Sequence, residues 1–522
     1  MKRSFYFTAI ILLFVYLMWY LLRRATLLSL THDESGTTDM AVVPVWDILF
    51  SPDQFQTANN HILHTLLMKM SVQLFGYREW AIRLPNVLAF VLYFAAGLRL
   101  MHLISSRAVI RFTGMVLLCS VPYLMDFFSL ARGYGMANAL GMAAFVALAE
   151  YGFVRRQRLL WIGFTCAALA AYANFTWLNL YLALWAVLAA TDLLVQHDAP
   201  LLHRSRLLVH APPLAIAAGL AWLSYKPIRI LRTRDEFKWG ADQWDASFSG
   251  LLNDLLYNQP LLFLSAEQSR SLLQVLFYGA MPALLRVSLA VLLKKKPTSL
   301  PSATATFTAA ATLVVLVGGI VLQRHWLNTY YIDGRKATLY IPLLLAVTVT
   351  ALAWLSEKHR NGGSIVAGLA VVVAAAHWFA SINFYSCREW WYDANSKEVA
   401  FRLAAAPEGQ RTIAVNWEFA PSLQFYNQHH LGNKLTILRT NETPQPPEAT
   451  FYYVMGDAIR NVPPVYRPVK RYFWDRFLLQ KDLATYHQEL QAAQEETTGT
   501  DAAQTLEEKR RNLNWSGLFW QE

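Results

Sequence analysis

The chain has 522 residues, of which 55% are hydrophobic and only 16% are charged, and its long apolar runs exclude an ordinary soluble enzyme. The formal net charge of +11 does not indicate nucleic-acid binding, because the basic residues are concentrated in short loops and no nucleic-acid motif accompanies them. Anionic membrane lipid is the expected partner of these cations. The cysteine count of three excludes a disulfide framework.

Apolar windows long enough to cross the hydrocarbon region predict about eleven spans. The first window is followed by Arg23 and Arg24 without a small-residue cleavage site, so we interpret it as a retained span rather than a removed signal peptide. We therefore expect a multi-pass α-helical membrane protein. The predicted spans are residues 5–22, 81–104, 109–128, 136–153, 159–175, 177–194, 207–225, 272–293, 307–322, 337–355 and 364–382.

The positions of lysine and arginine predict the orientation of the chain, because loops on the cytoplasmic side collect these residues. They place the N-terminus in the cytoplasm and the C-terminus outside the cell membrane. The cytoplasmic group comprises Lys2, Arg3, Arg107, Arg111, Arg155, Arg156, Arg158, Arg204, Arg206, Lys294, Lys295, Lys296, Lys358 and Arg360. The outer face then receives residues 23–80, the turn at 131–134, the loop 226–271, residues 323–336 and the chain after 383.

The first outer segment holds an acidic pair, Asp33 and Glu34, a few residues beyond the first span. It continues through the stretch Asn59-Asn60-His61 into a window, residues 61–75, whose apolar residues recur at helical spacing. We expect this window to be an amphipathic helix that lies along the membrane surface. A turn with aromatic and cationic residues, 76–85, then enters the second predicted span.

Beyond residue 383 the pattern changes to shorter elements. Strands are predicted at 411–415, 434–438 and 451–455, and helices at 397–405 and 420–428. This alternation predicts a small α/β outer domain. We therefore divide the chain into a membrane domain, 1–383, which includes the outer loops 23–80 and 226–271, and a soluble outer domain, 384–522.

The order of these motifs resembles one known family. The acidic pair, the Asn-His helix and the aromatic-x-x-Arg-Leu-Pro entry at 80–85 are similar to the GT-C glycosyltransferases, in the branch of protein O-mannosyltransferase and lipid A aminoarabinose transferase. The turns Ser129-Leu130-Ala131-Arg132-Gly133-Tyr134 and Tyr331-Ile332-Asp333-Gly334-Arg335-Lys336-Ala337 resemble two further arginine turns of that family. Together these motifs cover the first three quarters of the chain, and the final stretch carries none of them.

The resemblance implies transfer of a sugar, with inversion, from a polyprenyl-phosphate donor to an acceptor hydroxyl on the outer side of the membrane. It implies that Asp33 is the catalytic base and that Glu34 orients the site or contacts the acceptor. For the donor phosphate the candidates are Arg132 and Arg335, with Lys336 and Arg83 as weaker ones, because an arginine holds phosphate through two parallel hydrogen bonds. The expected substrate vicinity comprises Asn60, His61, Tyr134 and Tyr331.

Each of these residues also has an explanation without catalysis. An isolated Asp-Glu pair is usually a solvated turn, and a single arginine at a membrane edge usually reaches toward lipid headgroups. Asp126 lies near the outer end of its span, where an ionisable side chain needs a partner or a function. Pairing with Arg132 would explain its position, and its role stays open. The cations Lys226, Arg229, Arg232, Arg234 and Lys238, on a side expected to be poor in cations, fit an anionic substrate group or a lipid surface equally well.

His61 and His64 are three residues apart on a predicted helix, but no third metal ligand accompanies them. We expect no obligatory cofactor, and a divalent metal is permitted but not expected. The expected partners are the lipid-linked donor, membrane lipid, and an acceptor that is a glycan, a lipid or a protein. The expected location is the inner membrane of a bacterium.

Two other classes of protein remain as alternatives. A transporter or flippase of lipid-linked glycans should have ionisable groups near the middle of several spans and two similar halves, and the sequence has neither. A non-enzymatic assembly protein for envelope polysaccharide would use the outer domain for docking. Only an enzyme would consume the donor.

Overall fold

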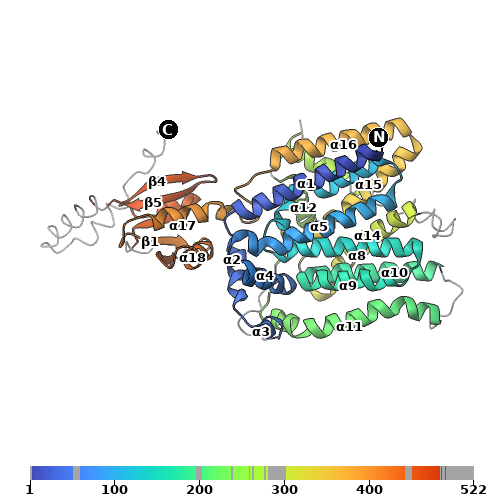
Figure 1. The fold of residues 1–522 in the computed structure, drawn as a ribbon, viewed down its shortest axis with the longest axis horizontal. Coiled ribbons are helices and arrows are strands. Elements are labelled where there is room, and N and C mark those ends of the chain that lie inside the picture. The colour runs from blue at the N-terminus through green and yellow to red at the C-terminus, as the bar shows by residue number, and fades with distance from the viewer. Residues whose placement is uncertain are drawn as a thin grey trace. The chain divides into compact units, whose positions relative to one another are not determined.

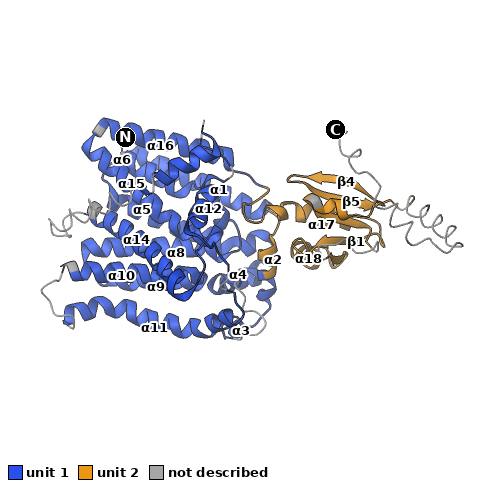
Figure 2. Ribbon diagram, turned by 180° about the vertical axis from the view of Figure 1, so that it is seen from behind, with its two compact units in different colours: residues 1–27, 37–384 blue, residues 28–36, 385–522 orange. Residues whose placement is uncertain are grey.

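The computed structural model describes residues 3–50, 59–195, 203–236, 239–257, 259–261, 264–275, 278–279, 301–440, 449–482, 484 and 488. The chain divides into two compact units, which Figure 2 distinguishes by colour. The first unit comprises residues 1–27 and 37–384, and the second comprises 28–36 and 385–522. Residues 28–36 thus belong with the C-terminal part of the chain, whereas the boundary predicted at 383 and 384 assigns them to the membrane domain.

The first unit is built from long apolar helices (Figure 1). Within the described residues, eight helices are long and apolar enough to cross a membrane, or nine if one bent pair counts as a single span. Together with the small sheet of the second unit, they confirm the predicted fold class, a multi-pass α-helical protein with a C-terminal α/β domain. The long helices are α1 Arg3–Leu27, α5 Glu79–Ile104, α8 Gly133–Val154, α10 Leu178–Val195, α11 Arg204–Thr233, α14 Pro301–Leu327, α15 Tyr340–Lys358 and α16 Arg360–Ser381.

Two of the predicted spans form a broken or a short helix, and a third lies mostly outside the described residues. The span at 109–128 is a bent pair, α6 Ala108–Cys119 and α7 Pro122–Phe128, with an angle of 61° between its parts. Pro122 causes this break, because the residue before a proline favours extended backbone and Val121 adopts φ −90° and ψ 109°. The span at 159–175 becomes α9, Arg158–Ala173, which has only 16 residues. Most of the predicted span 272–293 lies outside the described residues.

Helix α11 is longer than its predicted span, 207–225, because it continues to Thr233. Its 30 residues correspond to about 45 Å, against roughly 30 Å of hydrocarbon in a bilayer. Lys226, Arg229 and Arg232 therefore lie exposed on the last turns of a helix rather than in a loop. Arg234 is exposed directly after the helix, and Lys238 lies outside the described residues.

Helix α8 packs against α5, α9 and α14 and is buried along most of its length (Figure 1). Small residues allow this close packing, as is usual between membrane helices. At Gly141 a Cβ atom would lie 2.2 Å from the ring of Trp177, so that only glycine admits the indole there. The residues that precede and begin α8 are consequently held by a rigid framework.

The loop between α1 and α5 contains α2 His32–Thr38, the 3₁₀ helix η1 Asp39–Ala41, α3 Val45–Phe50 and α4 Ile62–Phe75. The predicted helix at 61–75 is confirmed. Its polar face is bonded to the protein, since Lys69 donates to the carbonyls of Ala41 and Val43. Its apolar side chains Leu67, Met70 and Leu74 are exposed instead, which is the arrangement of a helix that faces lipid.

The second unit contains a five-stranded sheet with the order β2-β1-β3-β5-β4. Strands β2, β1 and β3 are parallel, and β5 and β4 continue the sheet in antiparallel pairs. The three predicted strands and both predicted helices form within two residues of their expected limits. The elements are the 3₁₀ helix η5 Trp391–Asn395, α17 Ser396–Ala404, β1 Thr412–Asn416, α18 Ala420–His429, β2 Thr436–Thr440, β3 Phe451–Met455, β4 Tyr466–Tyr472 and β5 Arg476–Lys481.

Candidate functional site

The acidic pair lies in the first turn of α2, and its two members have different surroundings. Glu34 is fully buried, and its carboxylate accepts a hydrogen bond of 2.9 Å from the backbone N–H of Thr31. In return the backbone N–H of Glu34 donates to the hydroxyl of Thr31. This reciprocal arrangement is a capping box, which satisfies amides that the start of a helix leaves without partners. Glu34 thus fixes the start of the helix that carries Asp33. The Thr-x-x-Glu spacing is a signal in the sequence that could have identified this role, but it was not used.

Asp33 is 8% exposed and lies among carboxyl groups of the second unit. Asp393 in η5 contacts this turn, because its Oδ2 accepts a 2.6 Å hydrogen bond from the backbone N–H of His32. The charges of Asp33 and Glu34 both raise the pKa of Asp393, so the three carboxyl groups form one cluster. Sequence reasoning did not identify Asp393, because 361 residues separate it from His32 and no motif surrounds it.

Arg132 is the residue immediately before α8 and is 1% exposed. Its guanidinium donates to the hydroxyl of Thr37 at 3.1 Å and to the side-chain oxygen of Asn59 at 2.7 Å. The turn that presents it is fixed by Asn86 of α5, which donates to the carbonyls of Leu130 and Arg132. The arginine is therefore held in place before any substrate arrives. Thr37, which it contacts, follows Asp33 by four residues in α2.

His61 lies against the start of α8, with its Nδ1 3.0 Å from the carbonyl of Ala173 and its ring 4.9 Å from that of Tyr134. Gly133 permits this approach, because a Cβ atom there would lie 2.1 Å from the Ala173 carbonyl oxygen and 2.7 Å from His61. Burial lowers the pKa of His61 well below its ordinary value of 6.5, and the charges of Arg132, His64 and Arg335 lower it further. His61 is thus a neutral imidazole within electrostatic reach of two arginines.

The second arginine turn is the 3₁₀ helix η4, Gly334–Leu339, directly before α15. Asn138 of α8 donates to the hydroxyl of Thr338, which in turn donates to the carbonyl of Arg335. Through this chain of bonds, the helix that begins at Arg132 and Gly133 also anchors the turn that carries Arg335. The predicted grouping of Arg132, Arg335, His61 and Tyr134 is therefore present within the first unit.

The remaining predicted residues have local partners. Lys336 forms an ion pair with Asp333 at 3.2 Å and donates to the carbonyl of Trp239. Tyr331 forms an isolated bridge with Ala241 through paired backbone bonds of 2.9 Å. Arg83, although fully buried, donates to the carbonyl of Ala25 near the C-terminal end of α1. Asn60 accepts a bond from Thr65, next to His61.

Asp126, whose role the sequence left open with Arg132 as one possible partner, has Arg24 and Tyr257 as partners in the structure. Asp126 pairs with the buried Arg24 of α1 and accepts hydrogen bonds of 3.0 and 2.9 Å from the hydroxyl of Tyr257. Arg24 also donates to the carbonyl of Asn383, at the end of the first unit. A buried carboxylate needs a charged partner at this depth, and Arg24, which sequence analysis treated only as a flank of the first span, supplies it.

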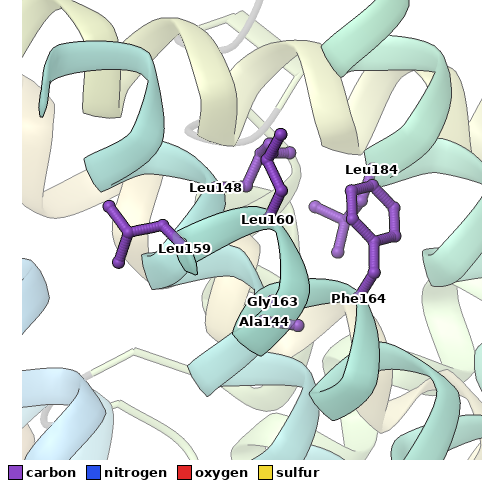
Figure 3. Close-up of a pocket in the computed structure, with 7 residues that line it drawn as sticks. All are labelled: Ala144, Leu148, Leu159, Leu160, Gly163, Phe164 and Leu184. Atoms are coloured by element: carbon purple, nitrogen blue, oxygen red, sulfur yellow. The ribbon is translucent and has the colours of Figure 1, made fainter. Parts of the chain in front are cut away.

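Two recesses in the first unit are lined by apolar side chains. One lies between α8, α9 and α10, is lined only by Ala144, Leu148, Leu159, Leu160, Gly163, Phe164 and Leu184, and has no polar group to hold a substrate (Figure 3). The other has a volume of about 200 Å³ and lies between α12, Trp244–Leu256, and the helices α14 and α15. It is lined by Trp244, Phe248, Tyr278, Leu313, Val317, Val321, Tyr340 and Leu344. No group of three or more His, Cys, Asp or Glu side chains that could hold a metal ion occurs in the part of the chain that the structure describes.

Comparison with known proteins gives similarity only at the level of solved structures. The chain is similar to ArnT from Cupriavidus metallidurans in the apo state, with a TM-score of 0.48 and 10% identity, over 92% of this chain and 98% of that one. It is similar to the same protein bound to undecaprenyl phosphate, with a TM-score of 0.47 and 11% identity. It is also similar to the arabinofuranosyltransferase AftD from Mycobacteria, with a TM-score of 0.46 and 14% identity, over 40% of that chain. No protein-family model and no curated protein matches the sequence.

Proposed function

We propose that this chain is a membrane glycosyltransferase that moves a sugar from a polyprenyl-phosphate donor to an acceptor hydroxyl on the outer side of the membrane. The observation that carries the proposal is the preset, buried guanidinium of Arg132, which lies with Arg335 near a neutral His61. Two guanidinium groups beside an uncharged imidazole make a locally positive site that fits a monophosphate. The motif order around these residues, which resembles the GT-C enzymes, supports the same assignment.

In the proposed reaction the acceptor oxygen forms a bond to the anomeric carbon as the bond from that carbon to the phosphate oxygen breaks. The electron pair of the broken bond stays on the polyprenyl phosphate, and attack from the opposite face inverts the anomeric centre. Arg132 and Arg335 stabilise the negative charge that develops on the departing phosphate. Hydrogen-bonding groups that are already fixed in position stabilise this charge without having to reorganise during the reaction.

The proton of the acceptor hydroxyl passes to Asp33 in this proposal. The capping box of Thr31 and Glu34 supports the role, because it fixes the first turn of α2 and hence the position of the Asp33 backbone. Glu34 then acts by orienting this turn, which is the first of the two roles that the sequence suggested for it.

An isoprenoid tail needs an apolar surface that reaches the lipid. The cavity lined by Trp244, Phe248 and Tyr340 has this character, and Tyr340 follows Arg335 by only five residues. We assign the tail to this cavity. The acceptor, whether glycan, lipid or protein, and the inner-membrane location remain part of the proposal.

The ion pairs of the first unit disfavour a transporter. Arg24 with Asp126, Arg206 with Asp192, and Arg99 with Glu150 all involve residues near the ends of their helices rather than near the middle. A transport path would place ionisable groups at mid-membrane depth.

The test is donor consumption by the full-length protein in lipid nanodiscs. A panel of polyprenyl-phosphate hexoses and pentoses is supplied, and release of free polyprenyl phosphate is measured by mass spectrometry. We expect Asp33→Asn to lower kcat by about 10²- to 10⁴-fold, the usual contribution of a general base, with little change in KM for the donor. Arg132→Lys should raise KM for the donor and lower kcat, because lysine keeps the charge but loses the paired hydrogen bonds.

Asp475→Asn and Arg99→Ala are the matched controls, because each residue belongs to an exposed ion pair. Both should keep the activity of the parent protein. Near-normal turnover by Asp33→Asn, or donor kinetics unchanged in Arg132→Lys, would overturn the corresponding assignment. A protein that moves lipid-linked sugar across the bilayer without consuming any donor in the panel would be a transporter.

A further inference from the structure

Asp393 is 1% exposed and lies in η5 of the second unit. Its two oxygens have separate partners. Oδ2 accepts the 2.6 Å bond from the backbone N–H of His32, and Oδ1 is 2.7 Å from the hydroxyl of Ser422 in α18. The hydroxyl of Ser396 is a further neighbour of Oδ1, at 3.4 Å. Asp393 therefore connects η5 and α18 to the residue immediately before Asp33.

We propose that Asp393 is a positioning residue for Asp33, which it serves as a protonated carboxyl group that fixes the first turn of α2 and leaves the negative charge of the cluster on Asp33. The inference rests on the proposed function, since it explains how Asp33, the proposed base, is held in position. It adds Asp393 to the residues of the proposed reaction, from the same unit as Asp33.

The bonding partners fit the protonated state. A neutral carboxyl group has one O–H donor and one carbonyl acceptor. The carbonyl oxygen accepts from the N–H of His32. Oδ1 accepts from the hydroxyl of Ser422 at 2.7 Å and has the hydroxyl of Ser396 at 3.4 Å, and a hydroxyl group can also accept a proton donated by a neutral carboxyl group. Both partners are satisfied without a negative charge on Asp393.

The charges around Asp393 favour the same state. Burial, followed by the charges of Asp33 and Glu34, raises its pKa to about 8 from an ordinary value of 3.8, although the bonds from His32 and Ser422 oppose the shift. In a cluster of buried carboxyl groups the pKa values move apart, so that one group keeps its proton while another stays ionised. The other titratable or charged groups that face Asp393 are Tyr392 beside it, Tyr453 on β3 and Arg476 on β5, whose guanidinium donates to the carbonyl of Tyr392.

The first experiment measures stability rather than activity. In the folded protein Asp393 keeps its proton between pH 3.8 and about 8, whereas the unfolded chain has lost it, so folding takes up a proton in this window. The stability that the proton supplies is complete below pH 3.8 and is lost as the pH rises toward 8. Asp393→Asn, which mimics the neutral carboxyl and has no proton to take up, should escape this loss.

The Tm of full-length Asp393→Asn should therefore rise relative to the parent protein as the pH increases from 5 to 8, and the difference should then stay constant. Asp475→Asn, an exposed residue of the same unit, should give a difference that is flat over this range. A flat difference for Asp393→Asn would overturn the proposal, because it would mean that Asp393 is ionised in the folded protein.

The second experiment measures donor consumption at pH 7. Asp393→Asn should keep kcat within about threefold of the parent, because the amide offers the same acceptor and donor. Asp393→Ala should lower kcat at least tenfold with little change in KM for the donor, because it releases the His32 N–H. If Asp393→Asn is as inactive as Asp393→Ala, the proposal is overturned, because the reaction would then require the negative charge of Asp393.

These outcomes are distinct from failure of the proposed function. If Asp33→Asn keeps full activity while the Tm profile of Asp393→Asn behaves as expected, then Asp33 is not the base but Asp393 still holds a proton in this cluster. If Asp33→Asn is inactive and the Tm profile is flat, the base assignment survives and the inference about Asp393 does not.

Discussion

Gly133 is the residue at which the packing around the proposed phosphate site is tightest. It lies between Arg132 and Tyr134, and a Cβ atom would collide with the Ala173 carbonyl oxygen, a backbone atom that has no freedom to move aside. We expect Gly133→Ala to displace the Arg132 turn, to lower stability by about 1–3 kcal/mol and to lower donor turnover. Thermal unfolding and the donor-consumption assay measure the two effects.

Gly318→Ala is the matched control, because it also lies in a long apolar helix and has no atom within 4 Å of the added Cβ. It should leave turnover unchanged and keep or slightly raise Tm. If Gly133→Ala behaves like this control, the close approach of His61 and Ala173 is not needed for the site.

The sequence predicted different roles for the two members of the acidic pair. Asp33 stays the proposed base, and Glu34, expected to orient the site or contact the acceptor, caps α2. The capping signature at Thr31 was visible and was a sufficient signal for this. Asp393 had no such signal, because its partners His32 and Ser422 lie 361 and 29 residues away. The same reason explains why Arg24, 102 residues before Asp126, was not considered as its partner.

At the scale of elements, Asn86 of α5 controls how α7 is connected to α8. Its amide donates to the carbonyls of Leu130 and Arg132, and its oxygen accepts the N–H of Met136 at 3.0 Å. All these groups are in a buried region, so removal of the amide leaves several polar atoms without partners at about 1–3 kcal/mol each.

We therefore expect Asn86→Ala to lower Tm strongly and, in protein that remains folded, to raise KM for the donor, because Arg132 is no longer fixed. Asn253→Ala, at an exposed position on α12, is the control and should change neither quantity. Hydrogen exchange of the amides at 129–136 gives a direct readout. Unchanged exchange in Asn86→Ala would show that other contacts suffice to hold the turn.

The residue pattern predicted some elements accurately and missed others. Strand β3 matches its predicted limits because Phe451 to Met455 is an uninterrupted apolar run in the middle of the sheet. Strand β4 was not predicted, since it is an edge strand that contains Pro468 and the three cations Arg467, Lys470 and Arg471, and only its two terminal tyrosines are buried. An edge strand needs few apolar residues and tolerates proline, so composition alone does not identify it. The bend at Pro122 was likewise hidden, because apolar windows measure length and not direction.

At the scale of the whole molecule, the charge pattern makes a prediction about orientation. Positions 239 and 473 should lie outside the membrane and position 358 in the cytoplasm, and all three side chains are exposed. Single cysteines at these positions can be labelled with a membrane-impermeant maleimide in spheroplasts. We expect Trp239→Cys and Phe473→Cys to react in intact spheroplasts and Lys358→Cys to react only after permeabilisation.

The background for this labelling is favourable, because Cys119 and Cys387 are buried. Cys166 is partly exposed and should first be replaced by serine. Reaction of Lys358→Cys in intact spheroplasts would reverse the orientation and would place Asp33 on the cytoplasmic side. A donor on the outer surface would then be out of its reach.

The membership of residues 28–36 in the second unit has a consequence for biosynthesis. The backbone N–H of Leu30 donates to the hydroxyl of Tyr426, a partner that is synthesised 396 residues later. At roughly 5–20 residues per second, the ribosome needs roughly 20–80 s to supply that partner. The segment that carries Asp33, the proposed base, therefore emerges early but gains this partner late. On the proposed function, we expect a nascent chain already inserted in the bilayer to show no turnover until translation is nearly complete.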